Sequence, residues 1–230
     1  MFEFLLPQKS VKGQVVLVTG GAMGIGRLMS LKFASLGAIV VVWDLNATLG
    51  HQVVQEIEAS GGQAHFYEMD VTNREHVYAV GKTIVDKFGA VDILVNNAGI
   101  VGGTPILESN DRFAAVGLMM SLRQELESMH KDGIHLTLIL PSFIKTGMFE
   151  GVTPPRFQSM LTPEYVADQV VKATRRNLWR VLLPGDMATL EMLLTIVPHW
   201  IGHFLVRFFR VGASMKTFKQ TRPHATLKNE

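Results

Sequence analysis

The segment Thr19-Gly20-Gly21-Ala22-Met23-Gly24-Ile25-Gly26 decides the fold of this chain, because it joins an apolar, β-branched run to an amphipathic stretch of helical length. Glycine at 20, 24 and 26 lets a backbone turn tightly and approach a pyrophosphate closely. The free N–H groups at the start of the following helix would then bind the phosphate charge. A merely flexible turn is the alternative, but the strand–turn–helix context favours binding. We therefore predict that Gly20, Gly24, Ile25 and Gly26 contact a dinucleotide.

Around this segment, short apolar runs alternate with amphipathic stretches over residues 14–95, as in repeated βαβ units that build a parallel sheet. Nearly continuous apolar strands suit burial on both faces. The predicted strands are 15–19, 39–43, 64–69 and 92–96. The predicted helices are 26–36, 47–60 and 74–88, each followed closely by a glycine, at 37, 61 and 89.

After residue 99 the pattern becomes loop-like, and then predicts helices over 112–130 and 163–176 and strands over 134–141 and 180–184. A chain of 230 residues fits one core, so we expect a single α/β domain over 1–230, a Rossmann-like doubly wound parallel sheet. Its predicted parts are a dinucleotide-binding half (14–99), the remainder of the fold (112–186), a C-terminal apolar helical region (187–217) and a tail (218–230).

The composition excludes several mechanisms. The chain has no cysteine, which removes disulfides, thiolate zinc sites and cysteine nucleophiles. The net charge is +2, and the 22 Lys and Arg residues form no long basic stripe, so we expect no nucleic-acid partner.

Asp44 ends the second predicted strand, 24 residues after Gly20. A carboxylate there can accept hydrogen bonds from both ribose hydroxyls of NAD, and it would repel the additional phosphate of NADP. Met23, Leu45 and Asn46 supply no positive charge to offset it. The alternative is an aspartate that only ends a strand, but strand ends in such sheets face the ligand crevice. We predict NAD(H) as the cofactor.

The TGxxxGxG spacing of the glycine segment resembles the short-chain dehydrogenase/reductase family, and three other segments resemble it too. Asn97-Ala98-Gly99 ends an NNAG motif, which in the family lines the adenosine side of the cofactor. Asp70-Val71 matches the pair that meets the adenine. Pro141, with Thr146 a few residues later, resembles the segment that reaches the nicotinamide amide. The resemblance therefore implies a cofactor contact for each of these residues.

Within the family, residues 113–117, 131–134 and 143–152 resemble the retinol and 17β-hydroxysteroid dehydrogenase (16C-type) branch. This resemblance implies a lipophilic small-molecule substrate, a retinoid or steroid alcohol or ketone, and an NAD-dependent oxidoreductase acting on CH–OH groups.

The catalytic set of the family is absent from the matching positions. The family pairs a tyrosine with a lysine one helical turn later, and here Arg112 stands at the lysine position with Glu108 four residues before it. A planar guanidinium does not replace an ammonium. On the order of fifty residues, more than one βαβ motif, are missing after Gly99, so the fold is one helix-strand unit short. We assign no catalytic residue and expect a catalytically impaired chain; a non-enzymatic NAD-binding or membrane-associated interaction protein is the alternative.

The missing unit also bears on packing. If the strand at 134–141 took the slot of the missing strand, the topology could still cross over right-handed. The absent helix would leave apolar surface uncovered, which predicts marginal stability and a weakened homodimer.

Two motifs are rejected. Tyr78 and Lys82 satisfy Y-x-x-x-K but lie in the third predicted helix, before the NNAG strand. His199 and His203 have the spacing of a metal pair but lack the glutamate of HExxH and a third ligand, so we predict no metal site.

Residues 188–211 are apolar with interspersed His and Arg, a pattern that suits a helix in a membrane interface or a helix pair that closes the substrate pocket. With the resemblance, this predicts the cytoplasmic side of the endoplasmic reticulum membrane or a lipid droplet surface; a cytoplasmic location is the alternative.

Overall fold

The computed structural model describes residues 6–99, 114–146 and 159–185. The described chain forms two compact units, and each is described by itself. The first unit is Met1–Gly99 with Pro163–Leu178, and the second is Ile100–Thr162 with Trp179–Glu230. The predicted apolar region (187–217) and tail (218–230) lie outside the described residues.

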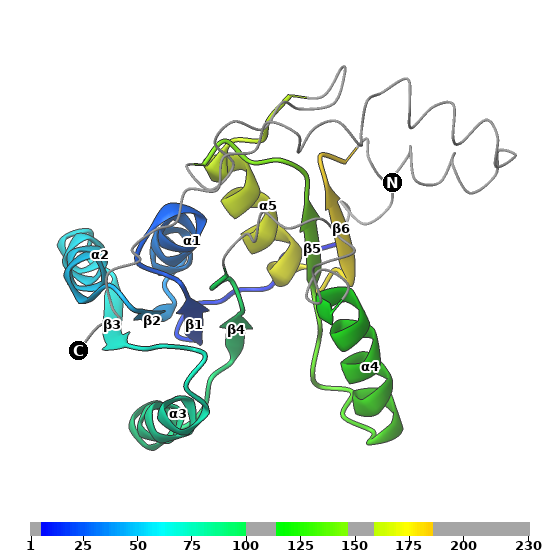
Figure 1. Ribbon diagram of the computed structural model, residues 1–230, viewed down its shortest axis with the longest axis horizontal. Helices are drawn as coiled ribbons and strands as arrows, with labels where there is room; N and C mark the ends of the chain where they lie inside the picture. The colour runs from blue at the N-terminus through cyan, green and yellow to red at the C-terminus, as the bar shows by residue number, and fades with distance from the viewer. Residues whose placement is uncertain (1–5, 100–113, 147–158, 186–230) are drawn as a thin grey trace, which may run out of the picture. The chain divides into compact units, whose positions relative to one another are not determined.

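The first unit is built on a four-stranded parallel sheet of order β3-β2-β1-β4, shown in Figure 1. Its strands are β1 (Val15–Thr19), β2 (Ile39–Asp44), β3 (Gln63–Glu68) and β4 (Ile93–Val95). Its helices are α1 (Gly24–Ser35), α2 (Ala47–Ala59), α3 (Arg74–Phe88) and α5 (Pro163–Arg175). The predicted alternation of strands and helices is confirmed, with each boundary within about two residues.

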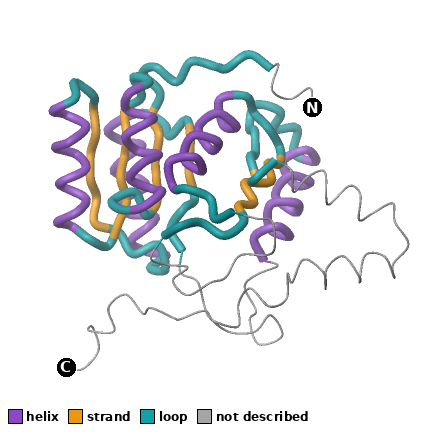
Figure 2. The backbone as a smooth tube through the Cα atoms, turned by 90° about the horizontal axis from the view of Figure 1, so that it is seen from above, coloured by secondary structure: helices purple, strands orange, loops and turns teal. Residues whose placement is uncertain are grey.

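The two faces of this sheet are covered by different helices, α1 and α2 on one and α3 on the other (Figure 1). Val16, Val18, Val40 and Val42 have no solvent-exposed surface, as expected for strands covered on both sides. The residues that alternate with these valines pack with Ile84 of α3 on the other face of the sheet. They are Val15 and Leu17 of β1 and Val41 and Trp43 of β2. Figure 2 shows the strands side by side with the helices alongside them.

The second unit contains α4 (Ala114–Ser128), β5 (Leu138–Pro141) and β6 (Arg180–Leu183). β5 and β6 form a parallel pair in which Leu138 stands opposite Arg180. The guanidinium of Arg123 on α4 lies 4.5 Å from the ring centroid of Trp179. This cation–π contact joins α4 to the segment that leads into β6.

The strand predicted over 134–141 is shorter than expected. Within that range only Leu138–Pro141 forms a strand, and it pairs in parallel with β6. In the described part of the chain β4 pairs with β1 alone. β5 is bonded to β6 and its neighbours along one edge, from the Leu138 N–H on the Trp179 carbonyl (2.8 Å) to the Ser142 N–H on the Leu183 carbonyl (2.7 Å). The Rossmann-like fold with a shortened region is confirmed.

Candidate functional site

The glycine segment connects β1 to α1 at the point where the strand order reverses. β1 has β2 on one side, reached through α1, and β4 on the other, reached only after two further crossovers. In open α/β sheets a crevice forms outside the carboxyl ends of the strands at such a point, and ligands bind there. The segment lies where the sequence predicts a binding loop.

Two glycines of the loop leave no room for a side chain. Gly20 has φ of +64°, and a Cβ built there would lie 3.0 Å from the Cα of Ala98. A Cβ on Gly26 would lie 1.9 Å from the carbonyl oxygen of Gly20. Gly24 also has a positive φ (+53°), but a Cβ there would meet nothing within 4 Å. The loop is therefore folded tightly on itself, and Gly24 faces open space.

The start of α1 is suited to a negative ligand. Met23 is the N-cap residue, and its side chain accepts no hydrogen bond from the first turn. The first turn contains no acidic residue, and the side chain of Ile25 within it is half-buried. Unpaired N–H groups at a helix N-terminus carry partial positive charge and stabilise anions. Together with the glycine cradle, this end of α1 can bind a pyrophosphate.

A partly buried hydrogen-bond network joins the loop to the segment after β4. The Thr19 hydroxyl donates to the Val95 carbonyl (3.3 Å) and accepts from the N–H groups of Asn97 and Ala98 (3.0 Å each). The Asn97 side-chain amide donates in turn to the carbonyls of Thr19 (3.0 Å) and Gly20 (3.2 Å). These bonds join residues nearly eighty positions apart, so the two predicted cofactor segments form one site.

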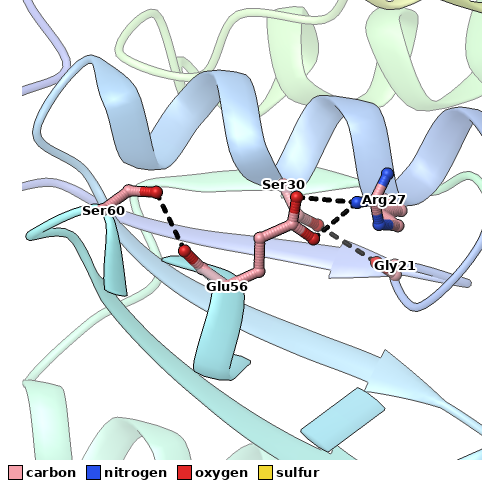
Figure 3. Close-up of polar contacts among 5 residues, drawn as sticks. All are labelled: Gly21, Arg27, Ser30, Glu56 and Ser60. Carbon is pink, nitrogen blue, oxygen red and sulfur yellow. Dashed lines mark hydrogen bonds and ion pairs between the residues drawn. The ribbon is translucent and has the colours of Figure 1, made fainter. Parts of the chain in front are cut away.

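A buried serine of α1 also holds the glycine loop. Ser30, which is fully buried on α1, has its hydroxyl 3.0 Å from the Gly26 carbonyl and 3.4 Å from the Gly21 carbonyl. Figure 3 shows the contact of Ser30 with Gly21 beside an ion pair between Arg27 of α1 and Glu56 of α2. The pair is partly exposed, so it contributes little to stability. The serine is the anchor, because its hydroxyl is enclosed in the core.

Both oxygens of the Asp44 carboxylate are held by backbone N–H groups. Oδ2 accepts from Ala22 (3.0 Å) and Oδ1 accepts from Asn46 (3.0 Å). An ionised carboxylate offers about four acceptor sites, so each oxygen can accept one further donor. Asp44 is therefore positioned against the loop with acceptor capacity remaining.

Asp70 and Val71 follow β3 at the same end of the sheet. The hydroxyl of Thr72 (2.7 Å) and then its N–H (2.9 Å) donate to the Asp70 carboxylate and lower its pKa below the ordinary value. Val71 is 44% exposed, and Leu45, directly after β2, is 65% exposed. Apolar side chains therefore stand beside the acceptors at these strand ends.

The remaining predicted site residues lie elsewhere. Gly99 ends the described segment of the first unit. Pro141 and Thr146 belong to the second unit, where the Thr146 N–H donates to the Ile144 carbonyl (2.8 Å). Arg112 lies outside the described residues. The structure thus brings Gly20, Gly24, Gly26, Asp44, Asn97 and Ala98 together in one unit.

Two positioning residues were missing from the sequence prediction, Thr19 and Ser30. Each had a signal. Thr19 is the hydroxyl residue between an apolar strand and the first glycine, and Ser30 is the polar member of a buried α1 stripe that also contains Met29 and Phe33. A lone hydroxyl among buried residues needs a partner, and here the partner is the glycine loop.

The rejected tyrosine–lysine pair has other contacts. The Lys82 ammonium forms an ion pair with Asp86 (2.8 Å), and the Arg74 guanidinium lies 5.6 Å from the Tyr78 ring centroid. Among the residues that the structure describes, no three His, Asp or Glu side chains are grouped as metal ligands. His199 and His203 lie outside them.

Comparison with known proteins gives consistent matches. Residues 14–112 match the short chain dehydrogenase family. Epidermal retinol dehydrogenase 2 of Mus musculus is 30% identical over 264 residues, which cover 89% of this chain and 85% of the relative. Short-chain dehydrogenase/reductase family 16C member 6 of Bos taurus is 32% identical over 77% of this chain and 74% of the relative.

The first of these alignments is longer than the 230-residue chain itself, so it contains gaps in this chain. Among solved structures, L-sorbose reductase from Gluconobacter frateurii, complexed with NADPH and L-sorbose, superposes with a TM-score of 0.63 at 20% identity, covering 78% of this chain and 98% of that one. The chain therefore belongs to the short-chain dehydrogenase/reductase family, within its retinol and steroid dehydrogenase branch.

Proposed function

We propose that this chain binds NAD(H) at the glycine loop and Asp44, and that its family activity is oxidoreduction of a lipophilic alcohol or ketone of the retinoid or steroid type. We further propose that the chain itself is catalytically impaired. The observation that carries the cofactor proposal is the hydrogen-bonded connection through which Thr19 and Asn97 join the β1–α1 turn to the segment after β4. A preorganised cradle of this kind lowers the cost of ordering the site when a ligand binds.

Each part of the site has a separate task in this proposal. The start of α1 would bind the pyrophosphate, since its N–H groups lack side-chain acceptors and Gly24 leaves the approach open. Asp70 would accept from the adenine amino group, because Thr72 holds its carboxylate in place at the end of β3. A bound nicotinamide supplies a hydride acceptor or donor.

Preference for NAD(H) over NADP(H) is assigned to Asp44. Its carboxylate is fixed by Ala22 and Asn46, so it cannot turn away from an approaching phosphate without breaking two hydrogen bonds. Exposed Leu45 and Met23 flank it without positive charge. The extra phosphate of NADP would meet a fixed negative charge, whereas ribose hydroxyls would meet an acceptor.

A cofactor titration tests this role. Asp44→Ala is expected to weaken NADH binding more than NADPH binding, so the ratio of the two dissociation constants moves toward or past one. Asp86→Ala is the matched control, since Asp86 is an exposed aspartate of α3. An unchanged ratio in Asp44→Ala would contradict the assignment.

Catalytic impairment is supported by residue types and by alignment length. No tyrosine precedes Arg112 by one helical turn, and the alignment with the mouse retinol dehydrogenase opens gaps in this chain. Without a tyrosine hydroxyl to exchange a proton with the substrate oxygen, hydride transfer has no general acid or base.

The test is a turnover assay with NAD and retinol beside a titration of NADH fluorescence. We expect saturable NADH binding without turnover. Reproducible turnover would show that the chain is an active dehydrogenase. Absence of NADH binding would contradict both the enzyme assignment and a non-enzymatic NAD-binding role. A longer transcript that inserts a tyrosine-containing segment between Gly99 and Phe113 would explain the short chain.

We also propose attachment of residues 188–211 to the cytoplasmic side of the endoplasmic reticulum or to lipid droplets, and a weakened homodimer. The interspersed His and Arg of this apolar segment support the first. Among the described residues, no helix has the length and hydropathy needed to cross a bilayer. Cell fractionation with and without residues 188–211 tests the attachment, and sedimentation tests the oligomeric state.

A further inference from the structure

The first unit carries a basic surface made from two segments far apart in sequence, residues 6–13 and 169–178. We define the basic surface by its five cations, Lys9, Lys12, Lys172, Arg175 and Arg176. Neither segment contains an aspartate or glutamate. Because the whole chain has a net charge of only +2, the rest of it is net negative and the positive charge is concentrated here.

Hydrogen bonds hold the two segments together. The Lys9 N–H donates to the Arg175 carbonyl, and Nε of Arg175 donates back to the Lys9 carbonyl, both at 2.8 Å. Nε of Arg176 donates to the Leu6 carbonyl at 3.1 Å. The side chain of Val11, which is 2% exposed, anchors residues 6–13 in the core. The cations are therefore clustered by the fold, since they come from opposite ends of the unit's sequence.

Asp168, the acidic residue next to these segments in the sequence, has another partner. Asp168, one turn before Lys172 on α5, forms an ion pair with Lys32 of α1 at 2.6 Å. Asp92 accepts from the Val15 N–H at 2.7 Å. Within the described ranges, no acidic group lies in ion-pair distance of any cation of the basic surface. Its charge is thus available to an external partner.

The basic surface lies far from the cofactor loop. Residues 6–13 lead into the start of β1, where the Gly13 N–H donates to the Gly37 carbonyl just after α1. The glycine loop follows the other end of the same strand. Five strand residues span roughly 17 Å. A partner on the basic surface therefore leaves the cofactor site open.

An apolar side chain accompanies the charges. Leu6 is 47% exposed, and Lys9, Lys12 and Lys172 are exposed on the same two segments. A membrane interface attracts lysine and arginine to its anionic headgroups and accepts neighbouring apolar groups. Neither segment has an aromatic residue to stack on bases, which favours a lipid surface over single-stranded nucleic acid.

We propose that the basic surface docks the first unit on an anionic phospholipid membrane. This contact is separate from the attachment proposed for residues 188–211 and does not depend on cofactor binding. It holds the sheet with the starts of its strands toward the membrane and the cofactor loop away from it.

The experiment measures sedimentation of the full chain with vesicles of phosphatidylcholine alone or with 30% phosphatidylserine, at about 0.1 M salt where charges are partly screened. The test variant is Lys9→Gln/Lys12→Gln/Lys172→Gln. It keeps Arg175 and Arg176, whose Nε groups donate to the carbonyls of residues 9 and 6 and so hold residues 6–13 against α5. The matched control is Lys82→Gln/Lys87→Gln/Lys131→Gln, which removes the same net charge from exposed positions elsewhere.

We expect phosphatidylserine to raise the affinity of the wild type for vesicles, and the test variant to lose on the order of a hundredfold of that gain, from three cations near the surface, while the control loses far less. Thermal melting and NADH titration should be unchanged in the test variant, so a folding defect or a failed cofactor proposal is recognised separately. Equal loss in both variants, binding independent of phosphatidylserine, or tighter binding to a polyanion such as single-stranded DNA would overturn the proposal.

Discussion

Helix α1 of the first unit and helix α4 of the second unit differ in how much of their apolar side chains is exposed to solvent. In the first unit, Phe33 of α1 is fully buried against a sheet whose central valines have no exposed surface. On α4, Leu118 is 67% and Met120 is 56% exposed. The glycine loop and the segment after β4 that it bonds both lie in the first unit. The comparison shows that α1 buries its large apolar side chain in a core, whereas α4 leaves two of its own exposed.

The largest expected effect contrasts the two helices directly. Phe33→Ala should lower the free energy of unfolding by about 3–5 kcal/mol, because it opens a cavity in the core of the first unit. Leu118→Ala should change it by less than about 0.5 kcal/mol, because the side chain is already exposed. Urea unfolding of the two variants measures both values. Similar losses would mean that Leu118 is buried and that the contrast is wrong.

The next effect concerns the close packing of the loop. Gly26→Ala should destabilise the chain by about 3 kcal/mol and abolish measurable NADH binding, because the new Cβ would collide with the Gly20 carbonyl. Gly81→Ala is the control: it lies in α3 with nothing within 4 Å of a Cβ, and alanine has the better helix propensity. Thermal melts and NADH titration should separate the two. A Gly26→Ala variant that binds NADH normally would contradict the cradle.

A smaller effect is expected from the network across the sheet. Thr19→Val should cost about 2 kcal/mol, because it leaves the N–H groups of Asn97 and Ala98 without their acceptor inside the site. NADH affinity should fall as the NNAG segment loosens. Thr19→Ser retains the hydroxyl and should recover most of the affinity. If serine and valine behaved alike, the hydroxyl would have no positioning role.

The smallest effect is electrostatic. The hydrogen bond from Lys32 lowers the pKa of Asp168 below its ordinary value of 3.8. Because the folded pKa is lower than the unfolded one, the pair stabilises the fold above about pH 4 and the contribution is lost as the pH falls through the folded pKa. Asp168→Asn should therefore cost less than about 1 kcal/mol at pH 7, both partners being partly exposed.

Denaturant titrations from pH 7 to pH 3 should show the difference between wild type and Asp168→Asn shrinking at the acidic end. Asp86→Asn, which removes the more exposed partner of Lys82, should have a smaller effect at neutral pH. A difference that grows on acidification would contradict the sign derived for Asp168.

Local sequence signals predicted the elements of the first unit well. Polar caps precede α2 and α3, where Asn46 and Asn73 accept from the N–H groups of Leu49 and His76. Glycines follow the helix ends, and apolar runs mark the buried strands. These signals act over a few residues, so a single sequence displays them.

Partners distant in sequence could not be predicted in the same way. The pairing of β5 with β6, the contacts of Thr19 with Asn97, and the joining of residues 6–13 to α5 all depend on which segments the fold brings together. A hydrogen-bonding group in a sequence indicates that a partner is needed and not which one.

The sequence by itself therefore determined the Rossmann-like class, the loop at 19–26 and the position of Asp44 at a strand end. These are properties of residue type and spacing. Only the tertiary structure decided that Gly26 has no room for a Cβ, that Ser30 and Thr19 hold the loop, and that five cations from opposite ends of the first unit's sequence share one surface. Close packing and long-range hydrogen bonds exist only once the chain has folded, since they join atoms that the sequence keeps far apart.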